Sequence, residues 1–476
     1  MQKPPESMQA ARPWAPRLAG RGGPIYLAIA DAIDEAIKSG ELPGGARLPT
    51  HRAMAEALGV DLTTVTRAYR EARQRGLLEA TVGRGTFVRK TSPEAASVGR
   101  AEGRGLIDLS MNLPPEPSDP PLRQLIQTGL ADLLSGPDAA SLLTYRPGAG
   151  SAEERAAGAA WVSPTLGEVD PGLVLVSPGA QPALLATLGL VARAGDLVLT
   201  DALTYPGFRG AAAQLGIRLC PVACDADGML PDAVEEACRG DDRPRALYCI
   251  PTLQNPTSIT LPLERRQALV DVARRHRLRI LEDDAYGVLP VRPLPALAAL
   301  APEITFHVST LSKVISPALR VAYVVAPDQG CAAKLAAALR ANVLTASPLL
   351  TALATKWVRD GTARSLLSAV RRECMARQEI AREILPAGSF LAQPEGLHLW
   401  LRLLPPWRRL DFASRIREQG LAIVPSDAFA VGEGTPPDAV RVSLGAAPSR
   451  EQLRIALRAI ATVFAGEASA PFLEIV

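Results

Sequence analysis

The sequence predicts an α/β protein of two folded units: a small N-terminal helical unit that ends in a β-hairpin, and a large body built on a doubly wound, mostly parallel sheet. At 476 residues the chain is too long for one compact core. Beyond residue 108, buried-strand patterns alternate with amphipathic helical patterns, which is typical of a parallel sheet. Between the units, residues 90–107 ("KTSPEAASVGRAEGRGLI") are rich in Ser, Gly, Ala and charge, and predict a linker.

Composition narrows the function classes. Apolar residues make up 47% and charged residues 21%, as in ordinary globular proteins. Residues 1–18 contain no apolar signal-peptide core and are expected to form a flexible tail, and no apolar run reaches the length of a membrane span. The six cysteines and four histidines lack metal-ligand spacing. We therefore expect a cytoplasmic protein with no membrane segment and no metal site.

Residues 19–89 predict three helices around a small core. The first helix ends at Gly40, and its apolar face consists of Tyr26, Ile29, Ala30, Ile33 and Ile37. Thr50 is placed to cap a short second helix that ends at Gly59, and Asp61 to cap a third. The inward face of the third helix is predicted to be Val65, Ala68, Tyr69 and Ala72. The short turn 59–61 is the spacing of a helix-turn-helix.

A basic hairpin follows the third helix. The stretch "LLEATVGRGTFV" reads as two short strands around a Gly-Arg-Gly turn, which predicts a wing. Residues 62–90 hold seven Arg and Lys against two Glu, a net charge of +5, whereas the whole chain carries only +3. A basic helix beside a basic wing is the electrostatic pattern of a protein that binds double-stranded DNA.

The segments "GGARLPTHRAMAEALGVDLTTVTRAYREARQRGLL" and "VGRGTFV" resemble the winged helix-turn-helix of the GntR family of bacterial regulators. The resemblance implies contacts to phosphates and bases from Arg52, Thr63, Thr64 and Thr66, and entry of Arg84 and Gly85 into the minor groove. Position 62, often Arg in the family, is Leu here, and Arg67 partly compensates for it.

In the body, polar residues follow several predicted strands, where a doubly wound sheet binds its ligands. They are Ser177, Gly179, Ala180 and Gln181 at a helix start, Tyr205, Asn255, Asp283 and Tyr286, and then Thr310, Ser312, Lys313 and Arg320. A single lysine is usually a surface residue. The ordered set is better explained by one ligand, pyridoxal phosphate, which needs a lysine for its aldehyde, an acid beside its ring nitrogen, donors at its ring oxygen, an aromatic stacker and a phosphate cup. Asp283 is the acid, and Arg320 is both a cationic neighbour of Lys313 and a phosphate clamp.

Residues 108–465 resemble the fold-type I aminotransferases of class I/II, which implies a smaller C-terminal subdomain and a tail after residue 465. In "TLSKVISPALRVAY" the resemblance makes Lys313 the Schiff-base lysine and places Arg320 on the phosphate. "EDDAY" pairs Asp283 with the ring nitrogen and Tyr286 with the ring oxygen, which Asn255 of "NPT" also reaches. Further roles fall to Ala180 and Gln181 (phosphate), Tyr205 (stacking), Tyr145 of "YRPGAG" (the phosphate of the partner subunit's site) and Arg441 of "VRVSLG" (the substrate carboxylate). Arg441 could instead be a strand-edge arginine, and Asp284, outside the motif register, is expected to be a solvated neighbour.

The combined architecture resembles the MocR subfamily of GntR-type regulators. It implies a head-to-tail homodimer that binds operator DNA and senses an amino-compound effector by transimination at Lys313. Because every catalytic position is present, enzymatic turnover stays open: the alternative is a working aminotransferase whose DNA-binding domain is incidental or autoregulatory. A regulator that has lost pyridoxal phosphate is disfavoured by the retained site residues. The effector, a vitamin B6 form, an ω-amino acid or an α-amino acid, is also left open.

Overall fold

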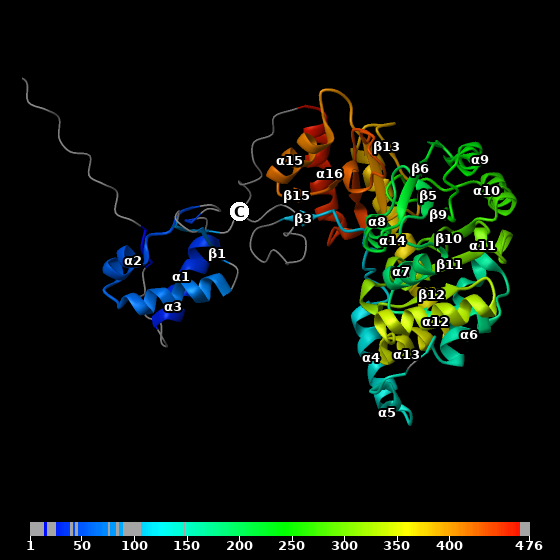
Figure 1. Cartoon of the computed structure of the whole chain (residues 1–476), viewed down its shortest axis with the longest axis horizontal. Coiled ribbons are helices and arrows are strands. Elements are labelled where there is room, and N and C mark those ends of the chain that lie inside the picture. The colour runs from blue at the N-terminus through cyan, green and yellow to red at the C-terminus, as the bar shows by residue number, and fades with distance from the viewer. Residues whose placement is uncertain are drawn as a thin grey trace, which may run out of the picture. The chain divides into compact units, whose positions relative to one another are not determined.

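The computed structural model describes residues 14–16, 25–38, 41–42, 46–74, 77–81, 85–88, 106–146 and 148–466. The chain forms two compact units, Met1–Arg104 and Gly105–Val476, and each is described by itself (Figure 1). Within the described ranges, no helix combines the length and the apolar character that crossing a bilayer requires.

The first unit is a three-helix core with a hairpin. Its elements are α1 (Ile25–Lys38), α2 (His51–Leu58), α3 (Leu62–Gln74), β1 (Leu78–Thr81) and β2 (Gly85–Val88), the two strands being antiparallel. Thr50 caps α2 by accepting a hydrogen bond from the Ala53 amide at 3.3 Å, and Gly59 ends the helix with a φ of +65°, which glycine adopts at little cost. The Asp61 carboxylate accepts from the Thr63 amide at 2.7 Å. The predicted helix starts and the inward face of α3 are thus confirmed.

The second unit is organised around a seven-stranded sheet. The strand order is β4-β12-β11-β10-β9-β5-β6. The strands are β4 (Val174–Ser177), β5 (Leu197–Asp201), β6 (Arg218–Val222), β9 (Ala246–Cys249), β10 (Arg279–Asp284), β11 (Thr305–Thr310) and β12 (Ala322–Val325). β12 runs antiparallel to both its neighbours and the other pairs are parallel. The prediction of a mostly parallel sheet is therefore confirmed.

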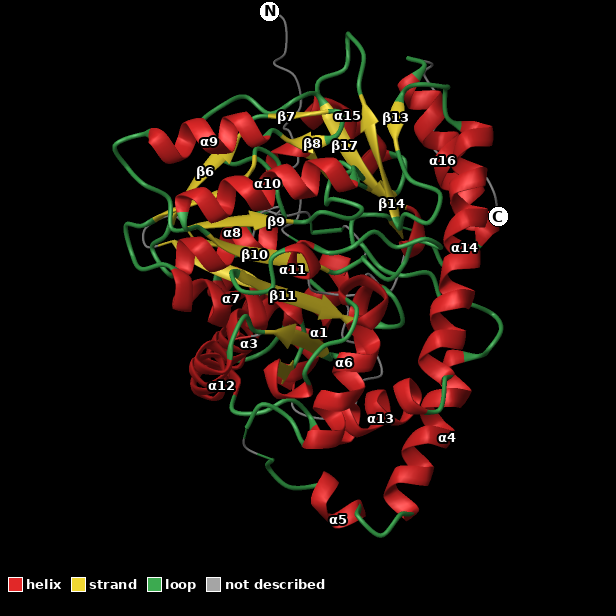
Figure 2. Cartoon of the chain, turned by 90° about the vertical axis from the view of Figure 1, so that its right-hand side faces the viewer, coloured by secondary structure: helices red, strands yellow, loops and turns green. Residues whose placement is uncertain are grey.

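Helices cover both faces of this sheet (Figure 2). One face packs against α7 (Ala180–Val191), α8 (Pro206–Gln214) and α12 (Gln329–Val343), and the other against α9 (Pro231–Arg239), α10 (Leu263–His276) and α11 (Leu297–Leu300). Alternate residues of β9 divide accordingly, because Tyr248 joins one buried cluster and Leu247 the other. Burial on both faces explains why these strands read as continuous apolar runs.

A smaller subdomain carries the C-terminal part of the chain. Its sheet, in the order β13-β14-β17-β16, consists of β13 (Phe390–Leu391), β14 (His398–Arg402), β16 (Val424–Pro425) and β17 (Ala439–Ser443). Its core also includes residues of α14 (Thr362–Ile384), α15 (Arg409–Glu418) and α16 (Arg450–Phe464). The first strand of the body, β3 (Ile107–Asp108), pairs in parallel with β15 (Leu421–Ala422). The chain that arrives from the first unit therefore enters the body through this subdomain.

The remaining elements flank the two sheets. They are α4 (Leu122–Ser135), α5 (Ala139–Leu142), α6 (Ala152–Leu166), α13 (Pro348–Arg359) and the small hairpin of β7 (Cys224–Asp225) and β8 (Gly228–Met229).

A buried arginine holds the loop that leaves β9. The guanidinium of Arg266, on α10, is 1% exposed and donates to the carbonyls of Leu261, Pro295 and Pro251 and to the Thr252 hydroxyl, at 2.9–3.0 Å. A buried charge is tolerated where every donor has an acceptor. These bonds close residues 251–261 into a fixed loop, and that loop carries Asn255.

We expect Arg266→Met to destabilise the body by about 3 kcal/mol or more, because a buried acceptor left without its donor costs about 1–3 kcal/mol. Differential scanning calorimetry of the full chain measures the effect as a drop in the melting temperature of the body. Arg274→Met on the same helix removes a half-exposed arginine that pairs with Glu303, and should cost less than about 1 kcal/mol. Equal losses in the two variants would contradict the anchoring role.

Candidate functional site

Lys313 lies directly after β11, in a one-turn helix (Leu311–Lys313) that Thr310 caps by accepting from the Ser312 amide at 3.2 Å. Its Nζ donates to the backbone carbonyl of Asn112 at 2.6 Å. Burial, followed by the positive charges of Arg441 and Arg320, lowers the pKa of Lys313 to about 8, and Asp283 opposes the shift. A substantial fraction of this amine is thus unprotonated just above neutral pH.

Asp283 presents one free carboxylate oxygen in the same region. Its Oδ2 accepts a hydrogen bond from the Tyr248 hydroxyl at 2.7 Å, and its buried Oδ1 has no partner among the described residues. Burial raises the pKa of Asp283 to about 6, and the charge of Asp284 adds to the shift, whereas the bond from Tyr248 opposes it. The ring of Tyr248 is itself fixed by stacking on Phe208, with centroids 3.6 Å apart. The carboxyl is therefore held in one orientation with an acceptor to spare.

The ring-oxygen side of the site contains two residues that the sequence motifs did not indicate. Asn112 donates from Nδ2 to the Tyr286 hydroxyl at 2.9 Å and lies 3.1 Å from His398 Nδ1. Burial and the charge of Arg441 lower the pKa of His398 to about 3, so the imidazole is neutral and can accept that bond. Asn112 belongs to no motif. Its position shortly after the predicted linker was the sequence feature that could have indicated it as a site residue.

The start of α7 forms a cradle. Gly179, the N-cap of the helix, has a φ of +104°, and a Cβ there would lie 3.0 Å from Nη2 of Arg320. Glycine at this position lets the exposed guanidinium approach the free amides of the helix start, which suits a phosphate. Gln181 donates to the Gly207 carbonyl at 2.6 Å, and the ring of Tyr205 lies over Gly207.

Arg441 lies on β17 of the smaller subdomain and points at the loop after β9. Its Nη1 donates to Asn255 Oδ1 at 2.7 Å, its Nη2 donates to the Ser110 carbonyl, and its guanidinium lies 5.0 Å from the Phe429 ring centre. Burial lowers the pKa of Arg441 to about 10, which leaves it cationic at neutral pH. Arg441 is thus a buried cation on a strand that is paired on both sides and not an arginine at a sheet edge, and its contact with a substrate carboxylate stays a prediction.

The expectation that Asp284 is solvated is wrong. Asp284 is 3% exposed, and its Oδ2 lies 3.0 Å from Nε2 of His307 on the neighbouring strand β11. Successive strand residues point to opposite faces of a sheet, so Asp283 faces the site while Asp284 needs its own partner on the other face. Tyr145 is 77% exposed, and its predicted contact with a partner subunit stays a prediction.

The residues around Lys313 fit pyridoxal phosphate chemically. Asp283 Oδ1, Ser312 Oγ and Gln181 Oε1 are among the buried polar atoms that lack partners in the described part of the chain. Buried polar atoms are normally hydrogen-bonded, so a polar ligand is indicated. A carboxylate oxygen suits a protonated ring nitrogen, and the Gly179 cradle with Arg320 suits a phosphate.

In the first unit, the predicted DNA contacts lie on α2, α3 and β2. Arg52, Thr63 and Arg67 are exposed, Thr64 and Thr66 are half-buried, and Leu62 is 43% exposed. The Thr66 hydroxyl donates to the Leu62 carbonyl at 2.9 Å and the Thr63 hydroxyl donates to Asp61, so both have intrachain bonds. Gly85 begins β2, and Arg84 lies outside the described residues.

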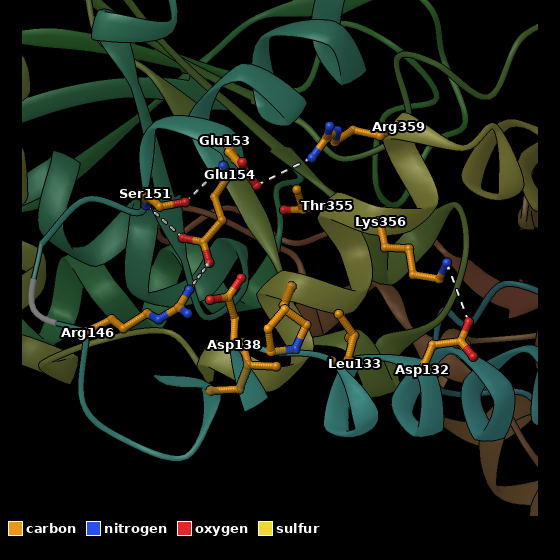
Figure 3. A pocket seen from close by; sticks show the side chains of 14 residues that line it. Asp132, Leu133, Asp138, Arg146, Ser151, Glu153, Glu154, Thr355, Lys356 and Arg359 are labelled. Atoms are coloured by element: carbon orange, nitrogen blue, oxygen red, sulfur yellow. Dashed lines mark hydrogen bonds and ion pairs between the residues drawn. The ribbon is translucent and has the colours of Figure 1, made fainter. Parts of the chain in front are cut away.

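A separate cavity of about 280 Å³ lies between α4, α5, the start of α6 and α13 (Figure 3). Each cation that lines it is paired with a carboxylate: Arg359 with Glu153 at 3.4 Å, Lys356 with Asp132 at 3.5 Å and Arg146 with Glu154 at 3.7 Å. Since these ion pairs satisfy the cations that line it, we assign the ligand site to the Lys313 region.

Comparison with known proteins agrees with both units. Residues 104–460 match the aminotransferase class I and II family, and residues 25–88 match the gntR family of bacterial regulatory proteins. The HTH-type transcriptional regulator YdeF of Bacillus subtilis is 30% identical over 92% of this chain and 94% of its own length. The vitamin B6 salvage pathway transcriptional repressor PtsJ of Salmonella typhimurium is 27% identical over 87% and 93%. The structure of LysN, an α-aminoadipate aminotransferase from Thermus thermophilus, superposes with a TM-score of 0.68 at 28% identity, over 76% of this chain and 93% of LysN.

A GntR-type winged helix joined to an aminotransferase class I/II domain defines a transcription regulator with an enzyme-like body. Within that class, the chain belongs to the MocR subfamily; the probable rhizopine catabolism regulatory protein MocR from Rhizobium meliloti is 28% identical over 64% of this chain and 66% of its own length.

The lowered pKa of Lys313 sets the pH dependence of cofactor attachment. Only the neutral amine attacks an aldehyde, so the rate at which cofactor-free protein attaches pyridoxal phosphate should rise about tenfold per pH unit below pH 8 and level off above it. Borohydride-stable incorporation followed by mass spectrometry measures this rate. A rate that keeps rising to about pH 10, as an exposed lysine would give, contradicts the burial argument.

Asp283→Asn should weaken pyridoxal phosphate binding about ten- to hundredfold near pH 8, because an amide cannot accept a charge-assisted bond from a protonated ring nitrogen. The affinity of the parent should also fall below pH 6, where its carboxyl becomes protonated, whereas the Asp283→Asn variant should lack this step. Fluorescence titration of the cofactor-free proteins measures both effects.

Tyr248→Phe removes the donor to Asp283 and should weaken binding less than Asp283→Asn. Tyr323→Phe is the matched control, because Tyr323 is a buried tyrosine of β12 whose hydroxyl has no partner among the described residues. Equal affinities in the two Phe variants would exclude a role for Tyr248 in orienting the carboxyl.

Proposed function

We propose that this protein is a pyridoxal-phosphate-dependent DNA-binding regulator whose body senses an amino-compound effector at Lys313. One observation supports the proposal most directly. Asp283, an acid with a free carboxylate oxygen, and Arg441, a buried cation, both lie near the half-buried Lys313, in a chain that also has a GntR-type winged helix. The name of PtsJ, a repressor of vitamin B6 salvage, supports the same combination of cofactor chemistry and DNA binding.

Each residue has a definite task in this proposal. Pyridoxal phosphate, when bound, supplies an aldehyde carbon that a lysine amine can hold and that an incoming primary amine can take over. Lys313 Nζ would form that link, Asp283 would accept a hydrogen bond from the protonated ring nitrogen, and Tyr286 and Asn255 would face the ring oxygen. Tyr205 would stack on the ring, and Ala180, Gln181, Thr310, Ser312 and Arg320 would hold the phosphate.

The effector is proposed to carry both an amino group and a carboxylate. The amino group would replace Lys313 on the cofactor, and the carboxylate would bind Arg441, the buried cation whose Nε has no partner among the described residues. Effector binding changes the DNA-binding unit only if it favours one of two states of the protein over the other.

A homodimer also belongs to the proposal. Leu143 and Tyr145 are 71% and 77% exposed in one chain, which is unusual for large apolar side chains so close together. The partner subunit is expected to cover them, with Tyr145 reaching the partner's phosphate site.

A second candidate is catalytic transamination. It is favoured by the complete residue set around Lys313 and by the 2-aminoadipate transaminase of Thermus thermophilus, 31% identical over 61% of this chain. Turnover separates the two candidates: multiple product molecules per site from an amino acid and an oxo acid would support the enzyme.

Lys313→Ala tests the proposal. The variant should bind pyridoxal phosphate without a borohydride-stable link, and an operator duplex selected from a random pool by the parent should no longer respond to an amino compound in a band-shift assay. Operator binding itself should persist, because it belongs to the other unit. An effector response that survives in the variant would refute sensing at Lys313.

Arg52→Ala should weaken operator binding and reduce the slope of log K against log salt concentration by about one, the value expected for one lost phosphate contact. Arg454→Ala is the control, because this arginine is in the body and pairs with Glu383. Fluorescence anisotropy at several salt concentrations provides the slopes, and equal slopes for the two variants would exclude the contact from Arg52.

A further inference from the structure

The segment Ser110–Asn112 accepts hydrogen bonds, through two backbone carbonyls, from the two cations that ligands of this site would bind. Lys313 Nζ donates to the Asn112 carbonyl at 2.6 Å, and Arg441 Nη2 donates to the Ser110 carbonyl. Lys313 lies in the turn after β11 of the large sheet and Arg441 lies in the smaller subdomain, so Ser110–Asn112 contacts both parts of the body.

An effector carboxylate would compete with Ser110. A carboxylate binds the edge of a guanidinium through two parallel bonds, and the Nε–Nη2 edge of Arg441 has a free Nε within the described part of the chain. Nη1 can keep Asn255 Oδ1 as its acceptor, whereas Nη2 belongs to that edge and already donates to the Ser110 carbonyl, so the ligand and the Ser110 carbonyl compete for Nη2.

The contact of Lys313 changes in the opposite sense. While Lys313 holds the cofactor, its Nζ is bonded to the aldehyde carbon and its bond to the Asn112 carbonyl is lost. When an effector amine takes that carbon, its C=N bond would form as that of Lys313 breaks, and the two protons of the effector amine would pass to Nζ. No water or oxidant is consumed, and Nζ is again an amine that can donate to Asn112.

The segment is the entry point of the chain from the DNA-binding unit. The amide of Leu109 donates to the Ala422 carbonyl at 2.8 Å, and β3 precedes it directly. Asn112 also bonds to Tyr286 through its side chain. A change at residues 110–112 thus acts on the stretch that follows the predicted linker 90–107.

We propose that Ser110–Asn112 reads the occupancy of the site: an amino-acid effector takes Arg441 from the Ser110 carbonyl and returns Lys313 to the Asn112 carbonyl, and this exchange alters the start of the body. The inference rests on the proposed function and adds the element through which that function is transmitted.

Hydrogen–deuterium exchange of the peptide 106–113 in the full-length protein tests the exchange of contacts. Three loaded forms separate the contacts: pyridoxal phosphate removes only the Lys313 contact, pyridoxamine phosphate leaves both, and N-(5′-phosphopyridoxyl)-L-leucine removes only the Arg441 contact. We expect the peptide to exchange slowest with pyridoxamine phosphate, and about fivefold or more faster with each of the other two, because each lacks one charge-assisted bond.

Arg441→Gln with pyridoxamine phosphate should exchange as fast as the parent with the leucine adduct. Arg402→Gln, an exposed arginine on the neighbouring strand β14, should match the parent. Equal exchange in all three loaded forms of the parent would overturn the inference, and this comparison requires no variant to fold.

The failure of this inference can be distinguished from that of the proposed function. Borohydride labelling at Lys313 together with an unresponsive peptide would reject only the reading role of Ser110–Asn112. No labelling at Lys313, or no binding of any of the three compounds, would reject the cofactor assignment itself.

Discussion

The proposed chemistry depends on keeping a substantial fraction of one amine unprotonated just above neutral pH inside a folded protein. Burial and the guanidinium groups of Arg441 and Arg320 push Lys313 in that direction, and Asp283 opposes them. Each of these charges must itself be held in place. Tyr248 orients Asp283, Asn255 and a main-chain carbonyl hold Arg441, and Gly179 gives Arg320 room to lie against the start of α7. The site is therefore one electrostatic unit, and a change at any member alters the protonation of the others.

The fold brings these groups together from distant parts of the sequence. Asp283 lies at the end of β10, Lys313 follows the neighbouring parallel strand β11, and the Asn255 loop follows β9 on the other side, so strand order alone places them at the same end of the strands. Arg441 comes from a second sheet and closes the site from the other side. Arg266 fixes the loop between them with four hydrogen bonds, although it touches no residue assigned to a ligand.

Local patterns in the sequence were sufficient for most of the architecture. Some features depend only on a few neighbouring residues and could therefore be predicted. They are the helix caps at Thr50, Gly59 and Asp61, the buried strands, and the short motifs around Lys313 and Asp283. The surroundings of the site could not. Tyr248, His398 and Asn112 act through contacts spanning 35 to 286 residues. Asp284 was misjudged because the identity of an acid does not reveal whether a histidine lies on the next strand.

The contacts of Ser110 and Asn112 with the two cations come from the main chain. No side-chain substitution at these positions deletes a carbonyl oxygen, so the residues there can change while the acceptors remain. Selection can then alter which amine or acid the pocket prefers without dismantling the connection to the linker. Such a segment can keep the same two contacts while its side chains are substituted, because the contacts require only that the backbone keeps its path.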